Sequence, residues 1–286
     1  MHLAAQILLN GILLGGLYGL MALGMGLVWG VLNIVNLAHG AFIMLGGYAV
    51  YYCHAGLGID PFAALPIAMV GLFCLGYLVQ RFVLSLIARA ALLNTLLVTF
   101  GIDVVLTYLA LFAFSADFRT INPSYAGDHF ELAGLTVPLA QLGAFATALV
   151  LAGGLRMFLA RTRTGRAIRA TAQNLTAARL HGINPRRIYP LCFGIGTALA
   201  GAAGGLYGVV SQVTPYMGNT LTAKSFVIAI LGGLDRPLGV LAGGVALGIA
   251  EATTDIYLDP TYRNAIGFGM LVAILVLRPT RLFERA

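Results

Sequence analysis

The chain has 286 residues, of which 59% are hydrophobic and only 9% are charged, and its formal net charge is +7. Charged residues make up about a quarter of an ordinary soluble domain, so this composition excludes a soluble globular protein and predicts a polytopic membrane protein. The positive charge does not indicate nucleic-acid binding, because the basic residues lie in loops where membrane topology favours them and no basic patch interleaved with aromatic residues occurs.

Apolar runs of about 17 to 25 residues, the length that a membrane-spanning helix needs, recur through the whole chain. We therefore expect an all-α fold, a single polytopic transmembrane helical bundle over residues 1–286 with about eight to ten membrane segments, including short or broken helices. Residues 3–52 contain no Asp, Glu, Lys or Arg and suffice for two crossings with a break near residues 33–40. Glycines four residues apart predict close helix contacts in this stretch: Gly15, Gly19, Gly26 and Gly30.

The middle of the chain contains two loops of different character. After spans over residues 62–78 and 90–114, residues 115–136 form a long polar segment without a basic cluster, and we expect an extracytoplasmic loop there. After another span over residues 137–159, residues 161–187 carry seven arginines and no acidic residue. That charge pattern predicts a cytoplasmic loop.

The last third of the chain begins with a span over residues 188–210. Residues 224–234 are apolar but reach only about half the length needed to cross a bilayer, which predicts a broken or re-entrant helix buried in protein. Spans over residues 238–257 and 265–277 complete the bundle, and the tail after them carries three arginines. We expect this tail in the cytoplasm.

The arginine-rich segment 161–187 has helical spacing in its middle. Apolar and small residues fall on one stripe and polar residues on another: Ile168, Ala172, Leu175 and Ala178 against Arg166, Arg169, Gln173 and Thr176. Thr164 is expected to cap the helix start, and Gly182, followed by Asn184-Pro185, to end it. We predict a short surface helix whose small-residue face is available to a soluble partner. The alternative is that the arginines only fix the membrane topology.

Polar residues in the first apolar stretch allow two interpretations. Asn33, Asn36 and His39 recur every three residues and would face one way on a helix. Polar groups at membrane depth need partners, so they could form interhelical hydrogen bonds or cap a helix break. They could also line a substrate path. Spacing alone favours the structural interpretation.

Ionisable residues near membrane depth are few, namely Asp103, Lys224, Glu251 and Asp255. Glu251 and Asp255 lie one helical turn apart, a spacing that would suit a proton or sodium site in a secondary transporter. Because their span ends close by, before Asp259, we expect both carboxylates near the outer surface in water.

Nucleotide hydrolysis by this chain is not expected. A phosphate-cradling loop needs a glycine directly before a lysine, and the only lysine, Lys224, follows Ala223. The sequence also lacks metal-ligand spacing and a G-x-S-x-G elbow. We therefore expect no enzyme, no cofactor and no metal site in the chain, and any coupling to ATP must come through a partner.

Three segments resemble one family. GLYGLMALGMGLVWGVLNIVNLAHGAFIMLGGYAV, residues 16–50, is similar to the N-terminal signature of LivH-type permease subunits of branched-chain amino-acid ABC transporters, most specifically in NLAHGAF followed by LGGYAV. GRAIRATAQNLTAARLHGIN, residues 165–184, resembles the cytoplasmic loop of that family that docks on ATPase subunits. VIAILGGLDRPLG, residues 227–239, resembles one of its late segments. One difference is Asn174-Leu175-Thr176, which stands where members often carry an acidic residue.

The resemblance implies a multi-pass subunit in the bacterial inner membrane. It implies a second, LivM-type permease, two cytoplasmic ABC ATPases that bind ATP and Mg, and a periplasmic substrate-binding protein as partners, with membrane lipid around the bundle. Closure of the ATPase dimer would move the coupling helices and alternate the access of the pore. The residues it implies are, for the translocation pathway, Asn33, Asn36, His39 and Gly40, and for ATPase coupling, Gly165, Arg166, Arg169, Ala170, Ala178 and Gly182.

The expected substrates are leucine, isoleucine and valine. Urea, amides or other amino acids are the alternatives, because the binding protein makes most of the selection in such systems. The alternative from another class is an ion-coupled secondary transporter or channel acting alone, with Glu251, Asp255 or Asp103 as its ion site.

Overall fold

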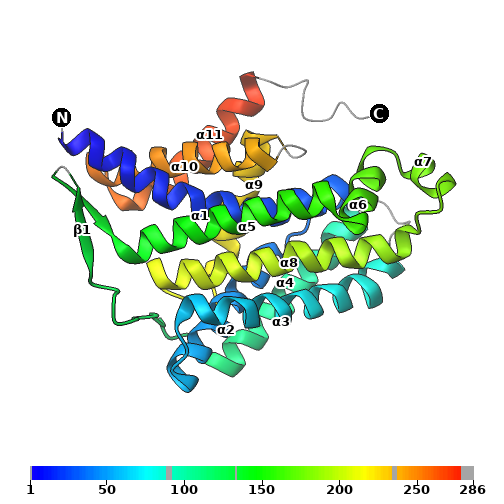
Figure 1. The fold of residues 1–286 in the computed structure, drawn as a ribbon, viewed down its shortest axis with the longest axis horizontal. Coiled ribbons are helices and arrows are strands. Elements are labelled where there is room, and N and C mark those ends of the chain that lie inside the picture. The colour runs from blue at the N-terminus through cyan, green and yellow to red at the C-terminus, as the bar shows by residue number, and fades with distance from the viewer. Residues whose placement is uncertain (1, 88–91, 133, 234–236, 278–286) are drawn as a thin grey trace.

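The computed structural model describes residues 2–87, 92–132, 134–233 and 237–277. They form an elongated bundle of helices with one small two-stranded sheet at one end (Figure 1), which confirms the predicted polytopic helical architecture. Among these residues, six helices are long and apolar enough to cross a membrane. The helices are α1 (His2–Leu32), α2 (His39–Leu57), α3 (Pro61–Phe82), α4 (Leu92–Phe114), α5 (Leu139–Arg161), α6 (Arg163–Gln173), α7 (Leu175–Leu180), α8 (Pro185–Val210), α9 (Met217–Gly232), α10 (Pro237–Tyr257) and α11 (Arg263–Leu277).

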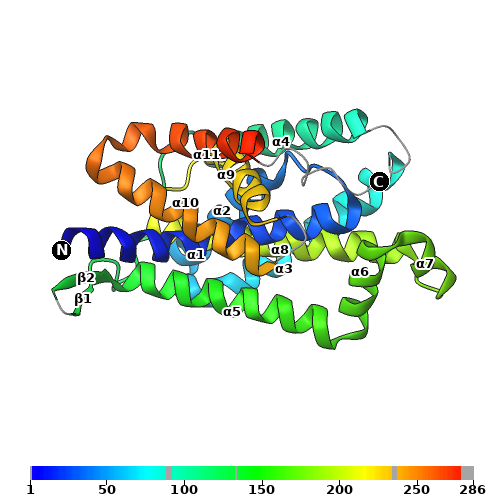
Figure 2. The same cartoon turned by 90° about the horizontal axis from the view of Figure 1, so that it is seen from above.

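Two helices form the centre of the bundle. In the most apolar stretch of α1 and of α8, 83% of the residues are buried, against 17% in α4. The periphery is therefore made of helices with one large apolar face turned outward, such as the face of α4 that carries Leu97, Tyr108 and Phe112. Figure 2 shows α5 along one edge of the bundle and α4 and α11 along the opposite edge. Exposed apolar faces of this kind are suited to contact with lipid.

Glycines bring α1 and α10 almost into backbone contact. A Cβ atom added to Gly11 or Gly15 of α1, or to Gly244 or Gly248 of α10, would fall on the backbone of the facing helix. Both pairs have the small-xxx-small spacing that permits close approach of membrane helices. The predicted close contact at Gly15 is thus confirmed, and its partner is a helix more than two hundred residues away in the sequence.

Short backbone contacts also hold α8 between α2 and α3. Gly46 of α2 lies against Gly201 of α8, and Gly204 of α8 lies against the carbonyl group of Ile43. On the other side, the Thr197 hydroxyl group donates a hydrogen bond of 2.8 Å to the Leu72 carbonyl oxygen of α3. Small residues of α8 at these contacts allow it to pack closely between α2 and α3.

The polar loop expected over residues 115–136 contains a hairpin that the sequence analysis did not predict. Strands β1 (His129–Leu132) and β2 (Leu135–Pro138) pair antiparallel. The hairpin lies at the end of the bundle where the N-terminus lies, and α6 and α7 lie at the opposite end (Figure 1). The Gln6 side chain joins α1 to the hairpin, because its amide donates 2.8 Å to the Thr136 carbonyl oxygen and accepts 3.0 Å from the Thr136 amide.

The short apolar segment predicted over residues 224–234 belongs to α9, which begins earlier, at Met217, and has 16 residues. Helix α9 runs away from the hairpin end of the bundle, and α10 returns toward that end. Gly232 at the end of α9 contacts Gly239 at the start of α10, and further along α10 Gly248 contacts Gly11 near the start of α1. Helix α9 is therefore a short helix followed by a reversal, and whether it is a broken or a re-entrant membrane element stays a prediction. Residues 234–236 lie outside the described part of the chain, as does the arginine-bearing tail after residue 277.

Candidate functional site

The first candidate site is the junction between α1 and α2, which confirms the predicted helix break. Helix α1 ends because Asn33 takes a φ of 53°, in the left-handed region that asparagine tolerates better than most residues. The Asn36 carboxamide oxygen then accepts a hydrogen bond of 3.2 Å from the Ala38 amide. The Thr99 hydroxyl group of α4 donates to the Val35 carbonyl oxygen at 3.2 Å. Polar side chains thus satisfy backbone groups that the break exposes.

His39 and Gly40 connect the start of α2 to α1 and α9. The fully buried His39 ring places Nε2 2.9 Å from the Met21 carbonyl oxygen of α1. The Gly40 amide donates to the Thr222 hydroxyl oxygen of α9 at 2.8 Å, and a Cβ atom on Gly40 would meet the Gly218 backbone. Only glycine lets α2 start this close to α9.

A buried ion pair links α1, α9 and α10 beside this junction. The Lys224 ammonium group of α9 lies 2.8 Å from a Glu251 carboxylate oxygen of α10. The Tyr18 hydroxyl group of α1 donates to the same carboxylate at 2.8 Å and accepts from Lys224 at 3.0 Å. The Glu251 side chain has no exposed area and that of Lys224 has 12%. Such desolvated charges persist only when each has a partner.

The second candidate site is the arginine-rich segment, which folds as two helices joined to α5 and α8. Thr162, two residues before the predicted cap Thr164, caps α6 by accepting 2.9 Å from the Gly165 amide. Asn174 ends α6 and caps α7 with a bond of 2.9 Å from the Ala177 amide, so the continuous helix that we predicted is interrupted there. We predicted Asn184 as part of the signal that ends a helix. In the structure its side chain also caps the start of α8.

Gly182 ends α7 as predicted. Its φ of +79° lies in the left-handed region. The Gly182 amide donates to the Arg179 carbonyl oxygen at 3.0 Å, and the Ile183 amide donates to the Ala178 carbonyl oxygen at 3.0 Å. This pair of bonds is the Schellman motif, in which glycine is the favoured residue. The turn fixes the direction in which the chain leaves α7 toward α8.

The small-residue stripe of this segment faces the bundle, which corrects the prediction that it is free for docking. Ile168 and Ala178 are buried, and Gly165 packs on the backbone of α5 at Phe158. The exposed residues include Arg166, Arg179 and Leu180, whose exposed fraction is 84% at the tip of α7. The surface available to a partner is therefore the basic face together with this leucine.

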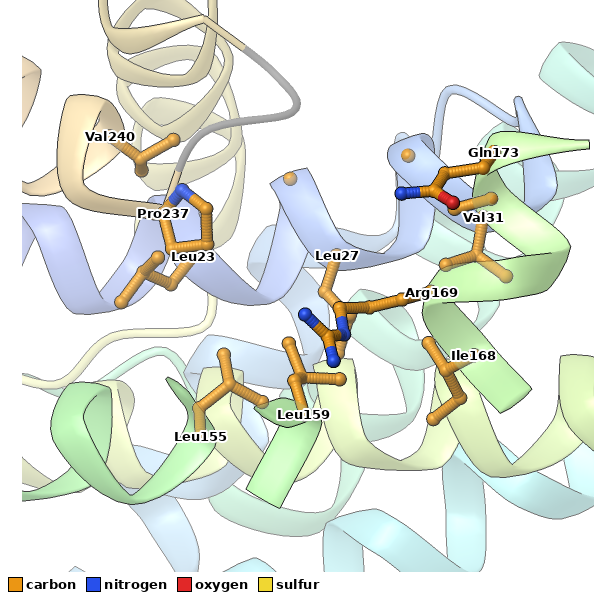
Figure 3. A pocket seen from close by; sticks show the side chains of 13 residues that line it. Leu23, Leu27, Val31, Leu155, Leu159, Ile168, Arg169, Gln173, Pro237 and Val240 are labelled. Atoms are coloured by element: carbon orange, nitrogen blue, oxygen red, sulfur yellow. The ribbon is translucent and has the colours of Figure 1, made fainter. Parts of the chain in front are cut away.

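A cavity of 230 Å³ lies between α6 and the centre of the bundle. Its walls are apolar residues of α1, α5 and the start of α10, and the polar side chains around it, Arg169 and Gln173, come from α6. Figure 3 shows Arg169 extending from α6 into the cavity between Leu27 and Leu159. Arg169 thus borders the cavity although much of the residue is exposed, and the open space leaves α6 room to shift against α1.

Comparisons with known proteins identify the family to which the chain belongs. The family described as "Branched-chain amino acid transport system / permease component" matches residues 7–275. The chain belongs to this permease family. It is 32% identical to the high-affinity branched-chain amino acid transport system permease protein LivH of Escherichia coli K12, over 98% of this chain and 95% of LivH. For the corresponding protein BraD of Pseudomonas aeruginosa the identity is 30% over the same shares.

A more distant similarity connects this permease with a second type of subunit. It is 26% identical to the high-affinity branched-chain amino acid transport system permease protein LivM of Escherichia coli K12, over 92% of this chain and 67% of LivM. The two named permeases of one system in that organism are thus both related to this permease.

The predicted pathway residues of the permease do not form one polar face. Asn36 and His39 are buried with the hydrogen bonds that the structural interpretation required, whereas Asn33 is exposed beyond the end of α1. The segment between them is not helical, so the three-residue spacing does not align the side chains. Gly40 lies next to His39 at the α9 contact. A role of these residues in transport remains a prediction.

Sequence reasoning misplaced Glu251 of the permease. We expected Glu251 near the outer surface in water, but it is fully buried and paired with Lys224. Asp255 is partly exposed and pairs with Arg263 at the start of α11. A signal was available, since the single lysine of the chain stands in an apolar segment and needs an acidic partner at that depth.

Proposed function

We propose that this chain is the transmembrane permease subunit of an ATP-binding-cassette importer in the bacterial inner membrane, and that it takes up leucine, isoleucine and valine. The observation that carries the proposal is that similarity to LivH and BraD runs over 98% of this chain and 95% of each relative. No large part of either relative is therefore left to supply a function that this chain lacks.

The partners proposed are a LivM-type permease, two cytoplasmic ATPases that bind ATP and Mg, a periplasmic substrate-binding protein and membrane lipid. The similarity to LivM supports a related second permease. We assign ATP binding to the partner ATPases because the one lysine of this chain is not in a phosphate-binding loop. Lys224 pairs with Glu251 inside the bundle and does not follow a glycine. The chain itself is proposed to be neither an enzyme nor a cofactor-binding protein.

The membrane arrangement proposed is a single domain with nine membrane segments, since α2, α9 and α11 join the six long apolar helices. Residues 161–187 form the cytoplasmic coupling loop, and residues 115–136 lie in the extracytoplasmic loop. The positive-inside rule supports the first assignment, because the loop carries seven arginines and no acidic residue. The opposite positions of the two loops in the bundle agree with both assignments (Figure 1).

The geometry suggests how a push on α6 and α7 reaches the pathway. Gly165 packs α6 on the end of α5, and the Asn184 cap joins the loop rigidly to α8. Arg169 extends into the cavity beside α1, which carries the unwound junction at its end. When the ATPases close, α6 would move against α1 and change the packing at Asn36 and His39. Rigid-body displacement of helices is an established way to switch access.

The experiment that tests the proposal is reconstitution of this chain with the four partner types in proteoliposomes. We expect ATP-driven uptake of leucine that requires the binding protein and both ATPases. Uptake of urea or a short amide in place of leucine would show that the chain is an importer subunit but that the proposed substrate is wrong. The matched control is the same preparation with ATPases whose P-loop lysine is replaced.

An ion-coupled carrier acting alone is the competing class. Two of its three candidate carboxylates, Glu251 and Asp255, each already pair with a cationic side chain of the bundle. A bound cation would have to displace those partners. Leucine uptake by the chain alone, driven by a proton or sodium gradient, would overturn the importer proposal in favour of this class.

A further inference from the structure

The buried face of α4 is polar along most of its length. Thr95, Thr99, Asp103 and Thr107 stand four residues apart, and all four are buried. The opposite face carries large exposed apolar residues such as Leu97 and Phe112. Hydroxyl and carboxylate groups on the inward face of a membrane helix each need a partner there, which the protein or a ligand must supply.

Asp103 and Asn36 border one cavity with unused hydrogen-bonding groups. The cavity has a volume of 310 Å³ and lies between α4, the α1–α2 junction, α9 and α11. Asp103 is 6% exposed and Asn36 is 2% exposed. Within the described part of the chain, Asp103 Oδ1 and Asn36 Nδ2 are buried without a hydrogen-bond partner. The Asn36 oxygen accepts from the Ala38 amide, so the NH₂ group is the end of this side chain whose hydrogen-bonding capacity is unused.

An unpaired carboxylate at this depth calls for a cation. Lys224, the one basic residue of α9, pairs with Glu251 at 2.8 Å, and the described lining of the cavity contains no Lys or Arg. Burial of an isolated carboxylate is costly, whereas a charge-assisted hydrogen bond from an ammonium group offsets much of that cost. A ligand that brings its own ammonium group would therefore complete the site.

The rest of the lining fits the other parts of an aliphatic amino acid. The Asn36 NH₂ group can donate to a carboxylate, and Thr222 and Asn219 add polar groups on α9. Leu37, Phe226 and Leu271 provide apolar wall. The volume is at the lower end of the range of about 300 to 1,000 Å³ usual for small-molecule sites, which suits a solute smaller than a drug.

We propose that Asp103 binds the ammonium group of the transported α-amino acid in this cavity, while the Asn36 amide donates to its carboxylate. The inference rests on the proposed import of amino acids and identifies a residue that recognises them inside the permease. It gives a function to Asp103, the one carboxylate on the inward face of α4.

The test compares Asp103→Asn, Asp103→Glu and the control Asp117→Asn in the complete reconstituted complex. Asp117 lies in the polar loop, with a side chain 70% exposed. We expect Asp103→Asn to lower the initial rate of leucine uptake roughly ten- to a hundredfold, the loss expected for one hydrogen bond to a charged group. ATP hydrolysis stimulated by the loaded binding protein should stay close to wild type. Asp103→Glu should recover part of the uptake, and Asp117→Asn should change nothing.

Leucine uptake at the wild-type rate by Asp103→Asn would overturn the inference and leave the importer proposal intact. Absence of ATP-driven uptake by the wild-type complex would instead overturn the importer proposal. If Asp103→Asn does not assemble, the wild-type complex is labelled with a hydrophobic carbodiimide during turnover, and modification of Asp103 is followed by mass spectrometry. Because the binding protein selects the solute before delivery, both solutes are also tested without it, at equal high concentration. Protection there by leucine but not by 2-hydroxy-4-methylpentanoate, which lacks the ammonium group, supports the inference; equal protection by both overturns it.

Discussion

Removing one charge of the buried ion pair should destabilise the permease, and the loss should depend on which of the two charges is removed. Lys224→Met leaves the carboxylate of Glu251, which has no exposed area, with only the Tyr18 hydroxyl group as partner. Glu251→Gln leaves the ammonium group of Lys224, whose side chain is 12% exposed and can reach some solvent. Breaking a buried pair costs about 3 to 5 kcal/mol. We expect Lys224→Met near the upper value and Glu251→Gln near the lower one.

The double variant Lys224→Met with Glu251→Gln removes both charges together. Replacement of a whole buried pair is often neutral or stabilising, so its loss should be smaller than that of either single variant. The free energy of unfolding would be measured on the purified chain in detergent by titration with sodium dodecyl sulfate, followed by helical circular dichroism. Asp117→Asn removes one partner of an exposed pair 3.5 Å apart and should leave the unfolding curve unchanged.

Two results would refute this reasoning. Single variants with wild-type stability would mean that the pair is solvated in the membrane protein. A double variant whose loss equals the sum of the single losses would mean that the two side chains do not interact, since contacting residues give non-additive effects of about 0.5 to 3 kcal/mol.

Three further predictions concern the coupling loop and the helix contacts. Leu180→Asp, at the exposed tip of α7, should reduce ATP-driven uptake by about tenfold or more if this leucine anchors the ATPase, and normal uptake with normal insertion would exclude that anchor. Gly182→Val should lose uptake because of the positive φ, whereas Gly182→Asn, which tolerates that conformation, should retain most of it; equal activities would show that the turn is not needed. Gly204→Val should prevent accumulation of monodisperse protein, because the valine side chain would meet the Ile43 carbonyl group. The matched control is Gly153→Val, since no neighbouring atom lies within 4 Å of a Cβ atom added at Gly153. Size-exclusion chromatography of both glycine variants decides the last case.

Local chemistry allowed part of this structure to be predicted. The helix break near residues 33–40 and the turn at Gly182 depend on backbone preferences of asparagine and glycine, which the sequence displays directly. The interruption at Asn174 was missed because apolar spacing continues across it from Ile168 to Ala178. A capping residue inside a periodic pattern is a stronger stop than the periodicity suggests.

Long-range contacts explain what could not be predicted. We predicted Glu251 near the outer surface because it is close in sequence to the end of a span. Its partner Lys224 reaches it only because the chain reverses between α9 and α10. His39 forms its hydrogen bond with a backbone oxygen of α1, and a contact of this kind cannot be predicted from a pattern of side chains. The small residues near Ala178 were taken for a docking face because a membrane bundle and a soluble partner favour similar helix surfaces. The β1–β2 hairpin had a weak signal in short alternating segments around Gly134.

The paired hydrogen bonds between Gln6 and Thr136 fasten the first helix at its outermost turns. Helix α1 has 31 residues, so at 1.5 Å per residue it is about 46 Å long. A tilt of only about 5° around the fastened end would displace its far end by about 4 Å. Small motions of this long helix are therefore magnified at Asn33, where the helix ends and the chain turns, so that they act directly on the junction with α2.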